Sequence, residues 1–184
     1  MSTWTIDPTH SQVGFAVRHM MISTVRGQFR DIKVAIDFDE ANPERSTVEA
    51  RIAATSIDTG AGQRDHHLRG ADFFDAATYP EIVFSSTSIE RDGDAYRIHG
   101  DLTIRDQTRP VVLNGEFHGT VAGMDGVRRA ALTAHTKISR KDWGLSWNVA
   151  LESGGWLLSD EIRIELDIAA TEAAERAARE AVAA

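Results

Sequence analysis

The chain has 184 residues, the size of one domain, and 42% hydrophobic with 26% charged residues excludes wholesale disorder. It contains no cysteine, which excludes disulfide frameworks, thiolate metal sites, iron–sulfur clusters and cysteine nucleophiles. The net charge of −8 argues against a general binder of DNA or RNA and against attraction to an anionic membrane surface.

The sequence offers no membrane-spanning helix, because no apolar run approaches the ~18 residues that such a helix needs. The opening residues, MSTWTIDPTHSQ, have neither the basic segment nor the apolar core of a secretory signal. We therefore expect a cytoplasmic protein without stable insertion into a membrane.

Alternation of apolar and polar residues with period two dominates the chain and predicts strands that each have one apolar face. Eight segments carry this pattern: 11–19, 32–38, 47–56, 81–90, 95–105, 110–119, 128–139 and 159–169. Phe29 is out of phase with the apolar stripe that begins at Ile32, which predicts a bulge near Arg30 and Asp31.

Turn sequences join neighbouring strands at 91–94 (RDGD) and 122–126 (AGMDG), as expected of antiparallel hairpins. Eight such strands either stack as a sandwich or close into a barrel, and closure leaves no free sheet edges. We predict an all-β fold with an eight-stranded antiparallel barrel. Small residues on the inner stripes, such as Ala50, Gly100 and Ala134, favour an apolar cavity over a filled interior.

Two long inserts interrupt the strands and are candidate lids or mouth elements. One is 56–80, in which 60–69 is predicted to be a short helix, and the other is 141–155, which is rich in tryptophan and glycine. The Ala-rich residues 171–184 pair Glu with Arg at helical spacing, which predicts a frayed helical tail. The expected organisation is one barrel domain at 1–170, followed by this tail.

Catalytic and cofactor motifs are missing from the sequence, including the serine hydrolase, zinc protease, P-loop and dinucleotide fingerprints. The seven histidines lack the spacings that announce a zinc site, so we expect no metal. Basic residues in 10–30 and 63–69 have two interpretations. They are either the solvent-exposed polar faces of a strand and a helix, or a cationic rim that contacts an anionic or polar head group.

Longer motifs occur in a fixed order along the chain: WTIDPTHSQVGFAVRH (4–19), VRGQF (25–29), SIDT (56–59), RDHHLR (64–69), DFFD (72–75), YPEIVFS (79–85), GDLTI (100–104) and SRKDWGLSWN (139–148). They resemble the YceI-like polyisoprenoid-binding family from about residue 4 to residue 169. The resemblance implies a lipocalin-like eight-stranded barrel. It also implies that the apolar interior binds a long isoprenoid lipid, either a polyprenyl diphosphate or an isoprenoid quinone, without a catalytic residue set.

On this interpretation the protein is a lipid carrier or store, with no cofactor besides the bound lipid. The channel would be lined by Val13, Phe15, Val17, Ile52, Phe84, Ile98, Leu113 and Phe117. Aromatic side chains near its ends would be Phe73, Phe74, Trp143 and Trp147. The polar end would be formed by His10, Arg18, His19, Arg26, Arg64 and His67.

Two other functions remain open at this point. An enzyme acting on an isoprenoid-like apolar small molecule needs a titratable group in the cavity, and His19 and Asp65 are the first candidates. A module whose interior is packed shut would bind no lipid at all. Members of the family often pair, so a homodimer is favoured, with an exposed strand or the tail as its contact.

Overall fold

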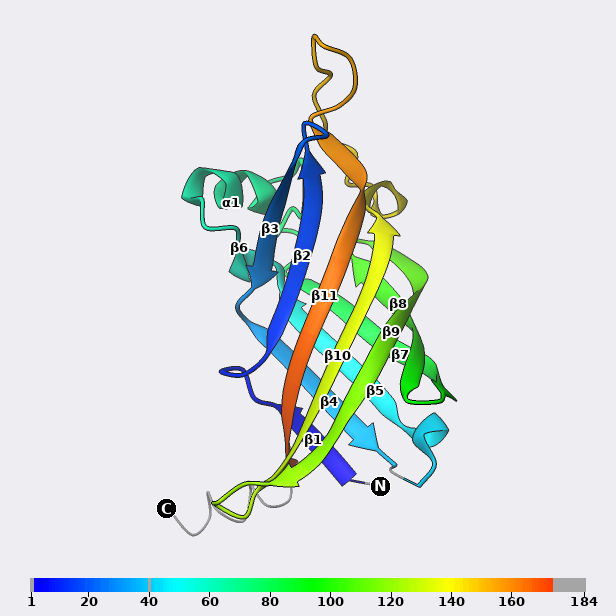
Figure 1. Cartoon of the computed structure of the whole chain (residues 1–184). Coiled ribbons are helices and arrows are strands. Elements are labelled where there is room, and N and C mark those ends of the chain that lie inside the picture. The colour runs from blue at the N-terminus through cyan, green and yellow to red at the C-terminus, as the bar shows by residue number, and fades with distance from the viewer. Residues whose placement is uncertain (1, 40, 174–184) are drawn as a thin grey trace.

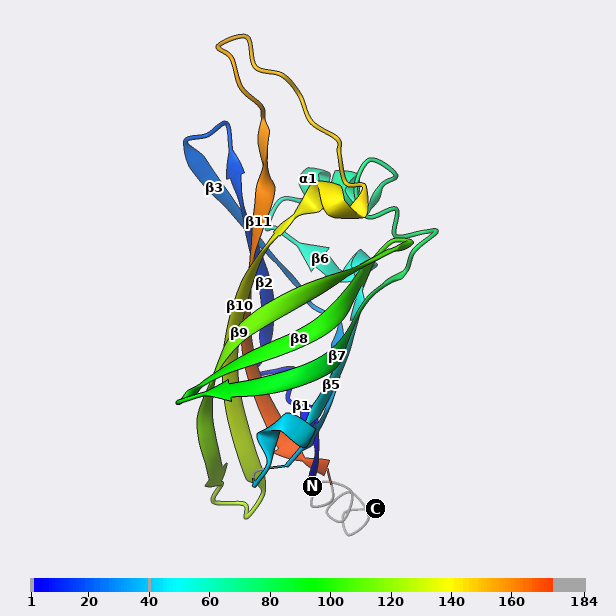
Figure 2. The same ribbon diagram turned by 90° about the vertical axis from the view of Figure 1, so that its right-hand side faces the viewer.

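The computed structural model describes residues 2–39 and 41–173 and shows a closed antiparallel barrel with one α-helix (Figures 1 and 2). Its strands are β1 (Ser2–Ile6), β2 (Gln12–His19), β3 (Ser23–Phe29), β4 (Ile32–Phe38), β5 (Thr47–Ala53), β6 (Ile57–Asp58), β7 (Glu81–Asp92), β8 (Ala95–Ile104), β9 (Gln107–Ala122), β10 (Arg128–Ser139) and β11 (Leu158–Glu172). Its helical elements are α1 (Gly62–Arg69) and three short turns, η1 (Pro43–Arg45), η2 (Ala54–Ser56) and η3 (Arg140–Trp143).

Eight strands form the barrel, in the order β1-β4-β5-β7-β8-β9-β10-β11, and pairing between β11 and β1 closes it. The predicted fold and strand number are therefore confirmed, but one member of the ring differs. The last residues of β11, 170–172, pair with β1, whereas residues 158–167 of the same strand pair with β2. β2, β3 and β6 thus extend the sheet from β11 instead of completing the ring.

β1 and β2 follow each other in the chain and both pair with β11, so the turn between them joins two successive contacts with this strand. The backbone N–H of Asp7 donates to the carbonyl of Ala169 (2.8 Å). Four residues later the hydroxyl of Ser11 donates to that carbonyl and accepts from the N–H of Ala169 (3.0 and 2.9 Å). The Ser11 hydroxyl therefore supplies hydrogen bonds to the backbone of Ala169 at the point where the turn interrupts the backbone ladder.

Asp7 organises this turn and supplies a test of it. Its carboxylate accepts from the backbone and hydroxyl of Thr9 and lies 2.9 Å from Nδ1 of His10. Hydrogen bonds from Thr9 and His10 lower the pKa of Asp7 from 3.8 to about 2. A lowered carboxyl pKa stabilises the fold above the unfolded value, and this stabilisation is lost as the pH falls from about 4 to about 2.

We expect Asp7→Asn to lower the free energy of unfolding by roughly 1–2 kcal/mol at pH 7, since the side chain is still 24% exposed. Urea unfolding curves from pH 7 down to pH 3 measure this, and the difference from the native sequence should shrink below pH 4. The control is Asp94→Asn in the exposed β7–β8 turn. A deficit for Asp7→Asn that stays constant with pH would refute the role of the carboxylate.

The predicted bulge near Arg30 and Asp31 needs correction. The change of phase at Phe29 is a strand end and not a bulge, because β3 pairs with β2 while β4 pairs with β1 and β5. Arg30 and Asp31 bridge instead to the backbone of Ser56 and Ala53 (3.1 and 3.0 Å). β11 also runs two residues beyond the predicted domain boundary at 170. The predicted helical tail falls largely on 174–184, outside the described residues.

The predicted helix and hairpin turns are present. α1 lies within the segment predicted to be helical, and tight turns join β7 to β8 and β9 to β10. In Figures 1 and 2, α1 and η3 lie at the upper end of the barrel, and the β9–β10 connection lies at the lower end. α1 and η3 therefore lie at the end of the barrel opposite the β9–β10 connection.

Candidate functional site

An apolar cavity of about 980 Å³ occupies the barrel interior, at the upper limit of ordinary ligand pockets. All four members of the β11 stripe face it: Ile162, Ile164, Leu166 and Ile168. Three of these, Ile162, Ile164 and Leu166, are only half-buried although they point inward. Inward apolar side chains that stay partly exposed show that the barrel is hollow, so the interior is not packed shut.

Eleven of the twelve predicted channel residues lie on the cavity wall. They are Val13, Phe15, Val17, Ile52, Phe84, Ile98, Leu113, Phe73, Phe74, Trp143 and Trp147. Phe117 is the exception: it lines a second hollow of about 70 Å³ and packs against Phe38, with ring centroids 5.2 Å apart. It lies on the same face of β9 as Leu113 but four residues further along, which carries it past the main cavity.

The polar groups of the cavity lining gather at the α1 end. Gln63, Arg64 and His66 are exposed residues of α1 that border the cavity, and they mark its mouth. His19, at the end of β2, borders it from the other side. Of the six residues predicted for the polar end, the structure therefore places His19, Arg64 and His67 on the cavity lining.

The other three predicted polar-end residues are elsewhere. His10 lies in the β1–β2 turn beside Asp7. Arg18 alternates with the inward Val17 and so faces out, while Arg26 pairs with Glu165 on the outer surface at 3.4 Å. These three residues therefore lie on the outer surface or in a turn, away from the cavity lining.

His67 connects α1 to the neighbouring loops at the mouth of the cavity through one polar contact and two ring contacts. Its Nε2 lies 2.8 Å from Oδ2 of Asp72, and its ring meets those of Phe73 and Trp147 edge-on, at 5.1 and 4.7 Å between centroids. These contacts link both long inserts of the sequence at one point. His67 therefore combines a polar group with a packing role at the entrance.

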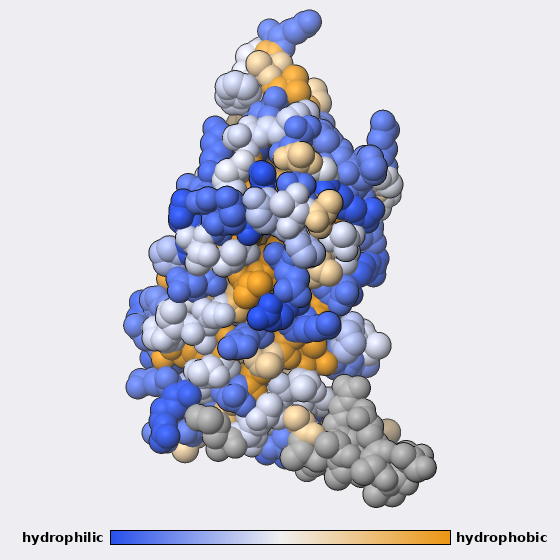
Figure 3. Space-filling view, turned by 180° about the vertical axis from the view of Figure 1, so that it is seen from behind, coloured by the Kyte–Doolittle hydropathy of each residue, from blue (hydrophilic) through white to orange (hydrophobic). Residues whose placement is uncertain are grey.

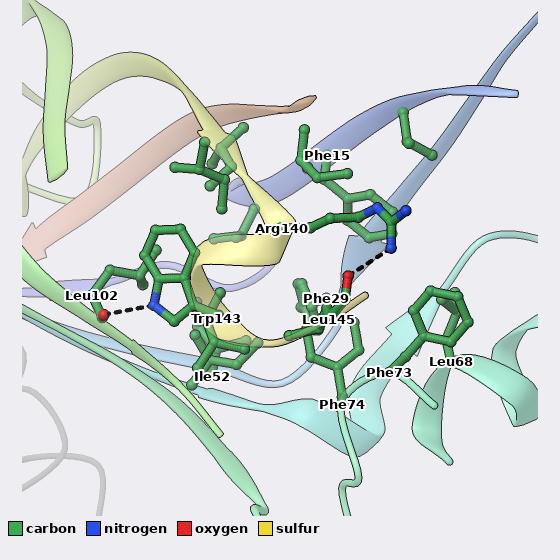
Figure 4. Close-up of a pocket in the computed structure, with 18 of the residues that line it drawn as sticks. Phe15, Phe29, Ile52, Leu68, Phe73, Phe74, Leu102, Arg140, Trp143 and Leu145 are labelled. Carbon is green, nitrogen blue, oxygen red and sulfur yellow. Dashed lines mark hydrogen bonds between the residues drawn. The ribbon is translucent and has the colours of Figure 1, made fainter. Parts of the chain in front are cut away.

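Arg140 is the main charged residue of the cavity lining that the sequence analysis missed. It is 5% exposed and lines the cavity, and its guanidinium donates to the carbonyls of Leu145 (2.6 Å), Trp147 (2.8 Å) and Ser159 (3.0 Å). Burial lowers its pKa, an effect opposed by Asp160, whose Oδ1 lies 3.4 Å from Nη2. Figure 4 shows this side chain reaching across to the carbonyl of Leu145.

The signal that could have found Arg140 is its phase. It continues the inward stripe of β10 through Ala134, Thr136 and Ile138, where an arginine must find partners or remain unpaired. Trp143, in the same η3 turn, is buried and donates from Nε1 to the carbonyl of Leu102 (3.0 Å; Figure 4). Together these two side chains hold the segment 140–147 over the barrel end.

A glycine on β3 makes room for the wall residue Phe15. A Cβ atom built on Gly27 would lie 2.3 Å from the Phe15 ring and 2.8 Å from Thr59, whereas one built on Gly14 meets nothing closer than 3.5 Å. We expect Gly27→Ala to destabilise the fold by about 1–3 kcal/mol, and Gly14→Ala to have a much smaller effect. Thermal unfolding of the two variants checks this, and equal losses would contradict the close packing of Phe15 against β3.

Neither a metal centre nor a membrane-spanning helix is found in the described parts of the chain. Across residues 2–39 and 41–173, no three His, Asp or Glu side chains gather closely enough to hold a metal ion. Likewise, no helix in these ranges is both long and apolar enough to cross a bilayer. The residues that line the cavity offer apolar burial, with a few polar groups at one end.

Comparison with known proteins agrees with this architecture. The family model described as a YceI-like domain matches residues 4–170. Protein YceI of Escherichia coli O157:H7 is 40% identical over 136 residues, which cover 74% of this chain and 71% of that protein.

Solved structures extend the comparison. The Campylobacter jejuni YceI protein aligns with a TM-score of 0.74 and 32% identity, covering 84% of this chain and 89% of the other. A polyisoprenoid-binding domain from Saccharophagus degradans, implicated in plant cell wall breakdown, aligns with a TM-score of 0.67 over 94% and 99% of the two chains. At 15% identity, this last similarity concerns the fold alone.

Proposed function

The chain belongs to the YceI-like family, and from this premise we propose that it binds one long-chain isoprenoid lipid in its barrel as a carrier or store. The observation that carries the proposal is the hollow interior of about 980 Å³, whose inward apolar side chains remain partly exposed. At roughly 30 Å³ for each non-hydrogen atom, this volume holds on the order of 30 atoms, the size of a prenyl tail of several units.

The polar end of the cavity fits the head group of such a lipid. Arg64 donates to the hydroxyl and carbonyl of Thr59 (2.7 and 2.9 Å), which holds its guanidinium beside the mouth. His19 and His67 add ring nitrogens from β2 and α1. Cationic and neutral donors at the end of an apolar channel suit a diphosphate or the carbonyl oxygens of a quinone.

Selectivity for one lipid has to come from channel length and head-group contacts. At ~0.8 kcal/mol per methylene, a tail of about thirty carbons would gain ~24 kcal/mol over water, above the ~18–21 kcal/mol ceiling of non-covalent binding. The comparison with water is therefore not the relevant one. The competitor is a bilayer, which is as apolar as the barrel, so the tail must match the cavity and the head group must match its mouth.

The proposed role includes no catalysis. Asp65, the carboxylate first considered for an enzyme, is buried and accepts hydrogen bonds from the backbone and hydroxyl of Thr59 (2.9 and 2.5 Å). It does not border the cavity, so it does not converge there with His19. The contacts of Asp65 support a structural role at the start of α1.

A matched series of prenyl lipids tests the proposal. The protein, delipidated by organic extraction and refolded, is titrated with prenyl diphosphates and quinones of increasing tail length, and its melting temperature is measured. A ligand that binds only the native state raises this temperature, and we expect the rise to peak at one tail length. No rise with any of these lipids, or an equal rise with saturated tails of every length, would contradict the proposal.

A further inference from the structure

Two neighbouring loops carry exposed apolar side chains beside the cavity mouth. The β2–β3 connection exposes Met21 (66%) and Ile22 (79%), and the loop before β11 exposes Trp156 (57%). Met20 and Val149 add to the same group, which we call the apolar tip (residues 20–22, 149 and 156). Five of the seven large apolar side chains found exposed among the described residues thus lie in these two loops.

The apolar tip is held together and is connected to the cavity. The N–H of Met20 donates to the carbonyl of Leu157 (2.7 Å), which joins the two loops. Ala150 and Trp156 pair across the second loop, so the loop is an ordered hairpin. Leu157 itself lines the cavity, as do Val17 and His19 below the first loop. A continuous path of side chains therefore runs from the tip to the cavity wall.

The shape of the tip favours a soft surface over a protein partner. Both loops project beyond the upper end of the barrel as narrow fingers (Figure 2), and hydrophobic residues are visible just below the hydrophilic end of the longer one (Figure 3). A standard protein interface uses about 20–30 residues on each side, far more than the five side chains available here. Tryptophan and aliphatic side chains at a projecting end are typical of groups that enter the interfacial layer of a bilayer.

The charged residues in and near the two loops indicate which kind of bilayer the apolar tip would contact. Residues 19–25 contain no Asp, Glu, Lys or Arg, and residues 149–157 contain a single charge, Glu152. The residues of the apolar tip include no basic side chain and the chain has a net charge of −8, so the tip itself supplies no attraction for anionic lipids. We propose that the apolar tip docks the mouth of the barrel reversibly onto a zwitterionic phospholipid surface, so that a bound lipid can pass between cavity and bilayer without crossing water. This inference rests on the proposed lipid-binding function.

Flotation with phosphatidylcholine vesicles tests the docking directly. The test variant is Met21→Asn/Ile22→Ser/Trp156→Ser, in which asparagine suits the positive φ of Met21 (64°) and all three sites are exposed. The matched control is Val121→Ser/Met124→Ser, which removes exposed apolar side chains at the opposite end of the barrel. Circular dichroism confirms that each variant is folded.

We expect the native protein and the control to float with the vesicles, and the test variant to bind at least about tenfold more weakly because its buried apolar area is lost. Adding anionic lipid should not strengthen binding. The inference is overturned if the native protein stays at the bottom of the gradient, or if test and control variants behave alike. A dimer that depends on the tip, without binding to vesicles, would assign the tip to a second copy of the chain and would also overturn it.

The lipid content of the same samples separates this inference from the proposed function. A test variant that keeps its co-purified prenyl lipid but no longer floats supports both the cavity and the docking role of the tip. Native protein that floats but never holds a prenyl lipid would contradict the proposed function alone. Native protein that holds the lipid but does not float would contradict the docking alone.

Discussion

Replacing Phe15 by Asp is expected to reduce the co-purifying lipid to background. Phe15 is on the cavity wall, packs against Phe29 at 5.9 Å between ring centroids, and pairs across the sheet with Ile164 of β11. A carboxylate at this point would be buried without a partner or would draw water into the apolar channel, and either outcome costs several kcal/mol. Mass spectrometry of an organic extract of the purified variant measures the loss.

The matched control for this substitution is Gln12→Asp, which makes the same change of charge on an exposed position of β2. It should leave the lipid content unchanged. If Phe15→Asp fails to fold, Ile164→Gln can be used instead, because it places an uncharged polar group on the neighbouring strand β11. This variant is expected to lower the lipid content as well. Folded Phe15→Asp protein that still carries the native amount of lipid would show that Phe15 does not contact it.

The second large effect is expected at Arg140. Arg140→Met removes every hydrogen bond that the guanidinium makes to the carbonyls of Ser159, Leu145 and Trp147, leaving buried acceptors without partners. We expect a loss of about 3 kcal/mol in the free energy of unfolding, because unpaired buried polar groups are costly. The segment that carries Trp147 would also loosen where it meets His67 at the mouth.

Lys141 provides the internal control. It is the next residue, has the same charge and shares Asp160 with Arg140 (Nζ to Oδ2, 2.9 Å), but its side chain is 53% exposed. Lys141→Met should therefore cost no more than about 0.5 kcal/mol. Urea unfolding of the two variants decides the point, and similar losses would show that Arg140 acts as an ordinary surface charge.

The strand pattern could be predicted from sequence wherever apolar residues alternate without interruption. β4 and β10 have the bounds that the pattern predicts, and the inner stripe of β11 is the one that lines the cavity. β1 was missed because it contributes only Trp4 and Ile6 as buried residues before the Asp7 turn. Such a short stripe is indistinguishable from a loop until its partners on β4 and β11 are known.

β3 was missed for a different reason, which depends on a contact with the neighbouring strand. Its inward stripe has Val25 and Phe29 but is interrupted by Gly27, and a glycine weakens any strand prediction. The structure explains the gap, because the ring of Phe15 occupies the space that a side chain at Gly27 would need. The local sequence of one strand is thus set by a side chain of its neighbour.

The candidate site likewise has a part that the sequence predicts, the apolar wall, and a part that it does not, the polar end. Wall residues on strands follow from alternation, so seven of the eight strand residues predicted for the channel border the cavity, and the four aromatic residues predicted from the inserts border it as well. The polar end depends instead on which termini of distant elements meet, and period two cannot supply this information. For Arg18 and Arg26, by contrast, alternation with the inward Val17 and Val25 already indicates an outward side chain. The phase of β10 likewise indicates that Arg140 lies inside.

The most direct test of the central claim is organic extraction of freshly purified protein followed by mass spectrometry. The protein should come from a host that makes both polyprenyl diphosphates and isoprenoid quinones, with a second sample incubated with vesicles that contain them. A prenyl lipid at close to one molecule per chain is the expected result, and its identity would name the head group at the mouth. No prenyl lipid in either sample, or only phospholipid in both, would contradict the account.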